Sequence, residues 1–563
     1  MKHLTATAKK SFHLLNATQF LGALNDNIFK LMIIYFLIQV KGAENANTIL
    51  SIAGSVFVIP FLLFSSAAGV LADKISKRTV IVATKVVEIL VMALGCLAIY
   101  LQSEISCYVL LFLMGAQSAA FGPSKYGIIP EIVDPNKVSK ANGSITALTY
   151  MAMILGSVSS SLLTQATGGN FFVIGLVCCA IAVLGTITSL GIQKTTTTPS
   201  NRKINPIFFY DVYKALSLSA KRPFLFPAIL GASFFLFIGG FVHLNVIPFA
   251  MESLQLSAVT GGYLFAATAV GIAIGARLAG KFCKERVELG LSCLAGFCIV
   301  VVFFLLTLFA SSLYLVVFFL TVLGIFGGLF VIPLESFIQL ASPQKRRGQI
   351  IAACNFLSFG FVLLASSAIY LLNERWGFTA SNSFVIIGFL TLLFNAIIAA
   401  RMSSFFFPYF MEKIFLRCAK LETKGDLLEK PGYIILKKYG LLHILLLSSV
   451  CKRLNVVALS KPLKRFPWIT GITNSIFFLS PSTNHNTTLQ RLFIRGKHVK
   501  TPQNMVAVIV DKEYNEEMIL KAYRKIFGEN SSNHLYFAQI KKRKKKRAVF
   551  SKNRYVCFFQ KML

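Results

Sequence analysis

The chain has 563 residues, of which 55% are hydrophobic and only 14% charged, and its mean hydropathy is +0.68. Soluble domains average about 25% charged residues, so this composition argues against a soluble globular enzyme. The net charge of +35 is divided unevenly: residues 1–402 carry 27 basic and 13 acidic residues, and residues 403–563 carry 30 and 9. We therefore expect a membrane domain with a net charge of +14 and a basic extension of +21.

Twelve stretches are apolar over the roughly 20 residues that a helix needs to cross a bilayer. Six precede a polar linker and six follow it, at 16–39, 48–71, 79–101, 107–129, 141–163, 170–192, 224–250, 258–280, 288–310, 312–334, 349–372 and 380–401. The predicted fold is an all-α membrane domain of two six-helix halves (1–193 and 224–402) joined by a cytoplasmic linker (194–223). A small α/β cytoplasmic domain (403–563) follows.

Basic residues mark one side of this arrangement. They lie at the N-terminus and in alternate connections, whereas the opposite connections hold little beyond Lys41 and Arg375. By the positive-inside rule, both termini and the linker are expected in the cytoplasm. The basic connections contain Lys74, Lys77, Arg78, Lys137, Lys140, Arg202, Lys203, Lys221, Arg222, Lys281, Lys284, Arg286, Lys345, Arg346 and Arg347.

The two halves also resemble each other. Residues 112–127 are similar to 320–337, and Pro135 and Pro343, 208 residues apart (343 − 135), each lie just before a further span. Two six-helix halves in parallel repeat are the organisation of major facilitator transporters. Chance similarity among apolar runs is the alternative.

The connection at residues 69–78 resembles the major facilitator loop signature G-x-x-x-D-[RK]-x-G-[RK]-[RK], with Ser76 where glycine is usual. Asp73 is placed to pair with a base or to cap a neighbouring helix, and such a contact would act as a conformational latch. The corresponding place in the second half holds Gly280, so a latch would be one-sided. A basic cytoplasmic turn is the alternative. The latch candidates are Gly69, Asp73, Lys74, Lys77 and Arg78.

Polar residues inside the first and fourth spans are the best candidates for substrate binding, because charges within a membrane are costly and need partners. Asn25, Asp26 and Phe29 share one helical face, which we expect to line a central cavity. The full set is Asn25, Asp26, Asn27, Phe29, Lys30, Gln117, Lys125 and Tyr126. The sequence leaves the roles of Glu88, His243 and Glu335 open.

Two elements carry a more specific resemblance. Residues 22–30 match G-x-x-N-D-N-x-x-K and residues 121–130 match F-G-P-x-K-Y-G-x-x-P, both typical of the lysophospholipid transporter family, which the chain resembles over residues 12–400. The resemblance implies flipping of lysophospholipids, such as lysophosphatidylethanolamine, across the bacterial inner membrane. Lys125 or Lys30 would then meet the phosphate and Asp26 an ammonium group. An Asp26–Lys30 pair that serves only packing is the alternative.

The extension begins with an aromatic segment, 403–417, expected to lie on the cytoplasmic leaflet. Beyond it, short strands at 433–436, 456–459 and 506–510 resemble the layout of a glycerolipid acyltransferase domain, whose catalytic element is N-H-x-x-x-x-D. Here Lys438 and His443 stand in the places of that histidine and aspartate, and a charged lysine is a poor base. We therefore expect no enzyme activity. An α/β domain of another kind is the alternative.

The basic run 541–547 is expected to bind anionic lipid headgroups rather than nucleic acid, with a solvated tail as the alternative. No cofactor or metal is expected, because the 11 cysteines show no metal-binding spacing. Three other functions remain open: export of another amphiphile or a drug, lysolipid acyl transfer, and a scaffold that recruits a separate acyltransferase. Energy coupling is also open between facilitated, proton-driven and sodium-driven transport.

Overall fold

The computed structural model bears out a mostly helical membrane fold, and its described residues form twelve helices long and apolar enough to span a bilayer. The first six form the N-terminal half: α1 (Ala6–Lys41), α2 (Ala46–Lys74), α3 (Lys77–Tyr100), α4 (Glu104–Ile132), α5 (Val138–Ala166) and α6 (Phe171–Leu190). The structure describes residues 6–42, 45–195, 208–222, 224–256, 258–283, 287–410, 420–425, 432–436, 454–459, 476–479, 490, 493, 505–509, 515–527, 534–543 and 554–561.

The second six spans form the C-terminal half, and α7 precedes them within the linker, where the sequence suggested no helix. The connections before α5 and α12 contain the turns η2 (Pro135–Lys137) and η3 (Gln344–Arg346), and η4 (Tyr370–Arg375) extends α12. The elements are α7 (Phe208–Ala220), α8 (Leu225–Leu254), α9 (Ala258–Phe282), α10 (Leu289–Leu308), α11 (Leu313–Ala341), α12 (Arg347–Ile369) and α13 (Ala380–Arg401).

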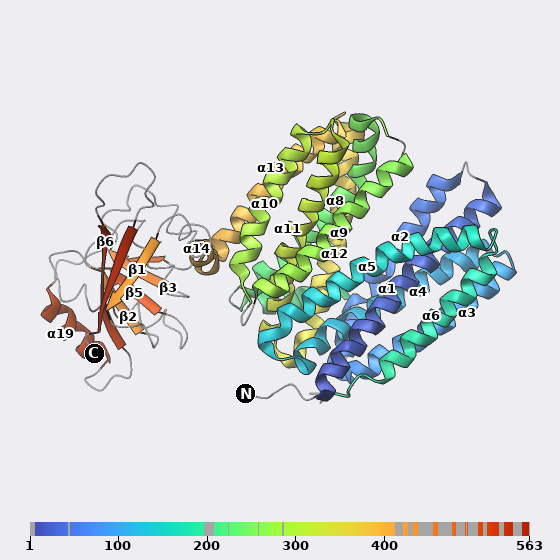
Figure 1. The fold of residues 1–563 in the computed structure, drawn as a ribbon. Helices are drawn as coiled ribbons and strands as arrows, with labels where there is room; N and C mark the ends of the chain where they lie inside the picture. The colour runs from blue at the N-terminus through green and yellow to red at the C-terminus, as the bar shows by residue number, and fades with distance from the viewer. Residues whose placement is uncertain are drawn as a thin grey trace. The chain divides into compact units, whose positions relative to one another are not determined.

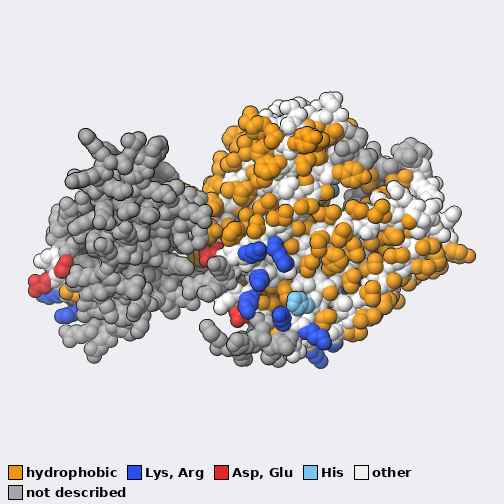
Figure 2. All heavy atoms as spheres, in the orientation of Figure 1, with side chains coloured by type: hydrophobic (Ala, Val, Ile, Leu, Met, Phe, Trp, Pro, Cys, Tyr) orange, Lys and Arg blue, Asp and Glu red, His pale blue; other side chains and the backbone are white. Residues whose placement is uncertain are grey.

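The lateral surface of the helical domain is apolar. On α3, Leu90, Leu94 and Leu97 recur on one face, and about half of each side chain is exposed. Figure 2 shows hydrophobic side chains over this surface, with Lys and Arg gathered near the end from which the N-terminus emerges. An apolar belt of this kind suits a lipid environment, and the basic end agrees with the charge pattern of the connections.

The two halves lie together at the basic end and diverge toward the other end (Figure 1). At the basic end, a Cβ on Gly69 of α2 would lie 2.5 Å from Ala352 Cβ of α12, and one on Gly143 of α5 would lie 2.3 Å from the Ala276 carbonyl oxygen of α9. Glycine lets these backbones approach closely. The halves are therefore closed against each other at this end.

The described residues of the extension form α14 (Ser403–Phe410) and a seven-stranded sheet of strand order β1-β7-β6-β2-β5-β3-β4. All neighbouring strands are parallel except β6 and β7. Helix α19 (Glu516–Phe527) belongs to the same small core as Tyr433 and Leu535. The strands are β1 (Lys420–Gly425), β2 (Gly432–Leu436), β3 (Leu454–Leu459), β4 (Ile476–Leu479), β5 (Met505–Ile509), β6 (His534–Arg543) and β7 (Arg554–Lys561).

This sheet bears out the α/β character expected of the extension, and β2, β3 and β5 fall where strands were predicted. Lys438, His443 and residues 544–547 of the basic run lie outside the described residues.

Candidate functional site

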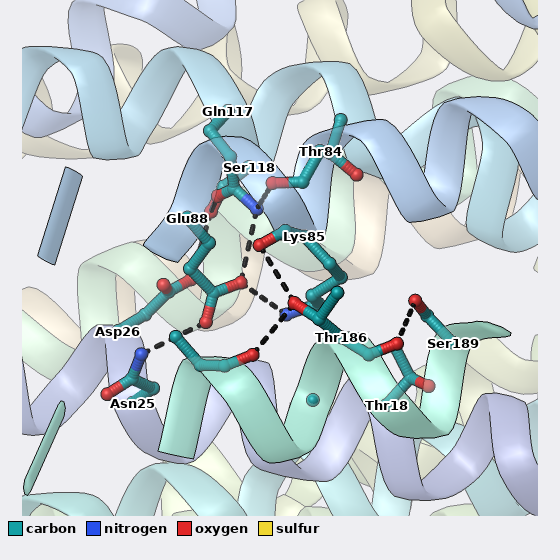
Figure 3. A network of polar contacts seen from close by, with 12 residues as sticks. Thr18, Asn25, Asp26, Thr84, Lys85, Glu88, Gln117, Ser118, Thr186 and Ser189 are labelled. Carbon is teal, nitrogen blue, oxygen red and sulfur yellow. Dashed lines mark hydrogen bonds and ion pairs between the residues drawn. The ribbon is translucent and has the colours of Figure 1, made fainter. Parts of the chain in front are cut away.

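A buried polar network joins α1, α3 and α4 inside the N-terminal half (Figure 3). Its centre is an ion pair between Lys85 and Glu88 of α3, with 2.5 Å between Nζ and Oε2 and only 2% of each side chain exposed. Asn25 Nδ2 donates to Glu88 Oε1 at 3.0 Å, and Gln117 Nε2 donates to Glu88 Oε2 at 3.3 Å. Both carboxylate oxygens therefore have partners, as a buried charge requires.

The Lys85 ammonium group lies in a space that α1 leaves open. A Cβ on Gly22 would lie 2.2 Å from Lys85 Nζ, so any larger residue there would displace the ammonium group. The same nitrogen lies 5.3 Å from the centre of the Phe121 ring, within the range of a cation–π contact. Gly22, the first residue of the G-x-x-N-D-N-x-x-K element (residues 22–30), thus leaves the space that this lysine occupies.

Among the described residues, only one of the two carboxylate oxygens of Asp26 has a hydrogen-bond partner. Ser118 Oγ donates to its Oδ2 at 2.9 Å, whereas its Oδ1 is buried and has no hydrogen-bond partner among the described residues. Lys30 Nζ lies over the Phe57 ring, 5.6 Å from its centre. The ion pairs formed by the described residues do not include Asp26 with Lys30. The i,i+4 pair considered from the sequence is thus not formed.

The substrate-binding candidates of α1 lie in different environments. Asn25 is fully buried against Glu88, and Asn27 Nδ2 donates to the Ala23 carbonyl oxygen within α1. Phe29 is fully buried in the core of the half, and a Cβ on Gly95 would lie 2.5 Å from its ring. Phe29 therefore lies in the packed core, and the expectation that it lines a central cavity is wrong. Its spacing placed it correctly on a helix face but did not show what that face contacts.

Helix α4 contributes Lys125, which is buried and lies over two rings, 4.4 Å from the centre of Tyr126 and 5.8 Å from that of Phe121. Lys125 also interacts electrostatically with Glu335 of α11, in the opposite half. Glu335 Oε2 is buried without a hydrogen-bond partner among the described residues. The described ion pairs include neither group, so each retains capacity to bind a ligand.

The predicted latch residues lie at the closed end. Asp73 accepts hydrogen bonds from the backbone N–H groups of Gly348 and Gln349, at 2.8 and 3.0 Å, and so caps the N-terminus of α12. Nearby, Lys77 pairs with Glu131 at 2.6 Å, and Arg347 of α12 lies 4.0 Å from the same carboxylate. The Asp73 bonds and the Arg347–Glu131 pair join the N-terminal half to the C-terminal half, whereas the Lys77–Glu131 pair lies within the N-terminal half.

The other latch candidates lie around this contact. Gly69 packs against Gly348 and Ala352, as a Cβ on it would lie within 3 Å of both residues. Arg78 donates to the Leu190 carbonyl oxygen at 2.8 Å, within the N-terminal half. Lys74 is partly exposed at the end of α2. We call the bonds of Asp73 to Gly348 and Gln349 the latch contact.

Sequence reasoning missed Lys85 and Ser118. A lysine three residues before a glutamate inside an apolar span was the available signal for Lys85, because neither charge is tolerated alone in a membrane. Ser118 carries no such signal, since a serine in a membrane helix commonly bonds its own backbone. His243 stacks edge-on against Phe265, with ring centres 4.3 Å apart, which places it in an aromatic contact of the C-terminal half.

Comparison with known proteins identifies the superfamily to which this architecture belongs. Residues 15–366 and 229–409 match the family model of the Major Facilitator Superfamily. The twelve helices and the closed contact between two halves thus define a major facilitator protein.

Known relatives identify the family within this superfamily. The lysophospholipid transporter LplT of Citrobacter koseri is 30% identical over 331 residues, covering 57% of this chain and 78% of the relative. LplT of Escherichia coli O9:H4 is 28% identical over 403 residues, covering 70% and 96%. The chain therefore belongs to the lysophospholipid transporter family of this superfamily.

Solved structures show the same fold. The human organic anion transporter MFSD10 matches with a TM-score of 0.55 and 16% identity, covering 69% of this chain and 99% of its own. The Escherichia coli fucose:proton symporter FucP matches with a TM-score of 0.55 and 14% identity, covering 69% and 98%. At these identities, the likeness concerns the fold alone.

Proposed function

We propose that the chain moves lysophospholipids, such as lysophosphatidylethanolamine, across a bacterial inner membrane by alternating access. The observation that carries this proposal is the combination of Asp26, which has an unpartnered oxygen, with Lys30 and Lys125, which lie against aromatic rings and not in ion pairs among the described residues. A zwitterionic headgroup offers one charge to each type of group.

In this proposal, the phosphate binds Lys125 or Lys30, and the ammonium group binds Asp26. Asn25 and Gln117 hold Glu88, and Ser118 orients Asp26. Glu335 and Lys125 attract each other across the two halves, and a phosphate on Lys125 would compete for that attraction. Substrate binding would thereby change an interaction between the two halves, as alternating access requires.

The orientation is part of the proposal. The basic end, with the linker and both termini, faces the cytoplasm. The latch contact then closes the cytoplasmic side, and the two halves diverge toward the outside (Figure 1). Gly69 and Asp73 hold the halves together at this end, and Lys77 and Arg78 support them from within the N-terminal half. The latch contact must break for the substrate to be released inside.

The experiment is uptake of labelled lysophosphatidylethanolamine into proteoliposomes, with and without an imposed ion gradient. Asp26→Ala should lose uptake by at least about tenfold, the equivalent of losing one charge-assisted bond, while expression in the membrane persists. Glu104→Gln, which alters the exposed pair with Lys41, is the matched control and should keep uptake. Wild-type uptake by Asp26→Ala would contradict the proposal that Asp26 binds the substrate. Uptake of other amphiphiles but not of lysolipid would favour the exporter alternative.

For the rest of the chain, we propose domain boundaries of 1–193, 194–223, 224–402 and 403–563. The extension is proposed to be an acyltransferase-like domain that is catalytically inactive, because Lys438 and His443 replace the catalytic pair.

The basic run 541–547 of the extension is proposed to bind anionic lipid, and the extension is proposed to recruit a separate acyltransferase. Acyl transfer by the purified full chain from a thioester or acyl-carrier donor would refute inactivity, and failure to retain an acyltransferase in a pull-down would count against recruitment.

A further inference from the structure

The linker helix α7 has two contrasting faces. On one face, Val212 and Ala215 are buried against Ala353 of α12 and belong to a small apolar cluster with Phe356. Ser219, one turn further along the same face, is also fully buried. This helix is therefore a docked element of the membrane domain.

The docked face lies beside the latch contact. Gln349 Nε2 donates to the backbone oxygen of Asp211 at 3.3 Å, and the backbone N–H of the same Gln349 donates to Asp73 Oδ2 at 3.0 Å. Helix α7 lies against α2 of the N-terminal half and against α8 and α12 of the C-terminal half. One residue thus connects α7 to the latch, and the helix spans both halves at the closed end.

The opposite face is aromatic and basic. Tyr210, Tyr213 and Lys214 lie together at i, i+3 and i+4, with 52% of Tyr210 and 69% of Tyr213 exposed. Phe209, 60% exposed, lies at the edge of the docked face, where its ring packs edge-on against Phe356. Lys214 Nζ lies 5.6 Å from the centre of the Tyr210 ring. The acidic residue of this helix, Asp211, is buried on the other side.

We propose that this exposed face of α7 binds anionic phospholipid headgroups of the adjoining leaflet and that the bound leaflet stabilises the latch contact. The position argues for a lipid surface, because α7 lies against the membrane helix α2 and against the N-terminal part of the membrane helix α12. The chemistry argues for it too, since tyrosine favours the headgroup region and lysine is attracted to anionic lipid. Exposed Lys221 and Arg222 directly after α7 add to the charge.

A mechanical consequence follows from the contacts on both halves. When the basic end opens, α2 and α12 separate, and α7 must leave one of them. A leaflet that holds α7 in place therefore opposes opening, so anionic lipid would favour the closed latch. This control of the conformational state does not depend on which substrate is carried.

The first test is fluorescence quenching in vesicles that contain brominated lipid. Tyr213→Trp is placed in a chain whose two tryptophans are replaced (Trp376→Phe, Trp468→Phe). We expect stronger quenching by brominated phosphatidylglycerol than by brominated phosphatidylcholine at equal mole fraction. Adding Lys214→Gln should weaken this preference, by up to about fivefold in local lipid enrichment, which corresponds to about 1 kcal/mol.

The matched control is Tyr314→Trp in the same background, because Tyr314 is 88% exposed at the opposite end of the membrane domain. It should be quenched equally by the two lipids. Equal quenching of Tyr213→Trp by both lipids would overturn the anionic preference. If Tyr213→Trp were not quenched at all while Tyr314→Trp was, the face would not contact lipid and the proposal would fail.

The second test follows the latch itself by hydrogen exchange of the Gly348 and Gln349 amides. Their exchange should be slower in vesicles with phosphatidylglycerol than in phosphatidylcholine alone, by up to about fivefold. Lys214→Gln should remove most of that difference, and Tyr314→Ser should preserve it. Identical exchange in the two lipids would refute the link to the latch, whether or not lysolipid is the substrate.

Discussion

Two of the contacts between the halves occupy equivalent places in the repeat but have different chemistry. Asp73 and Gly280 are 207 residues apart (280 − 73), and their partners, Gly348 and Lys140, are 208 apart (348 − 140). In the first contact, Asp73 caps α12 with two hydrogen bonds. In the second, a Cβ on Gly280 would lie 2.9 Å from Lys140 Cα, so the backbones touch. One contact depends on charge, and the other depends on close packing.

The same contrast extends into the interior of the halves. The N-terminal half contains the buried pair of Lys85 and Glu88, whereas the C-terminal half packs rings such as Phe241, Phe249 and Phe303 around Phe384. A carboxylate cap is weakened when it gains a proton or loses one bond, but a packed contact is weakened by a change of volume. The N-terminal half thus has a buried ion pair at the centre of its polar network, whereas Phe384 of the C-terminal half is surrounded by packed rings.

The largest effect is expected at the buried ion pair. Lys85→Met would leave the Glu88 carboxylate buried without its ammonium partner, which costs about 3–5 kcal/mol of stability. Thermal unfolding in detergent measures the loss. Lys41→Met, which breaks the exposed pair with Glu104, is the matched control and should cost no more than about 1 kcal/mol.

The double variant Lys85→Met with Glu88→Gln separates charge from shape. Because no buried charge remains, it should be more stable than Lys85→Met alone. If the double variant is no more stable, the loss comes from packing around Gly22 and the ion pair is not the cause.

The next effect is expected at the packed contact. Gly280→Leu would force α9 away from α5, and overpacking of this kind costs about 1–3 kcal/mol. Faster hydrogen exchange at the N-terminal turns of α5 measures the separation. Gly239→Leu in α8 is the control, because a Cβ there would meet nothing within 4 Å. Equal effects of the two substitutions would show that close approach at Gly280 is not what holds this contact.

The sequence predicted the outline of this comparison but not its details. Hydropathy located the spans because each must satisfy its own backbone bonds in lipid, and the loop signature located Asp73. Neither indicates which neighbour a helix face meets, so Phe29 was assigned to a cavity and Lys85 was missed. Helix α7 was missed because its apolar residues alternate with tyrosines in a linker read as polar. Such features depend on tertiary contacts far apart in the chain.

The smallest effect is expected at the capped contact. Asp73→Asn keeps the shape and an acceptor but loses the negative charge at the N-terminus of α12, worth about 1 kcal/mol. The Gly348 and Gln349 amides should then exchange about fivefold faster. Asp134→Asn is the control, because Asp134 caps η2 by accepting from Asn136 N–H within the N-terminal half. If Asp134→Asn accelerates the same amides equally, the capped contact does not act through the charge of Asp73, and the charge difference between these two equivalent contacts would not matter for how they hold.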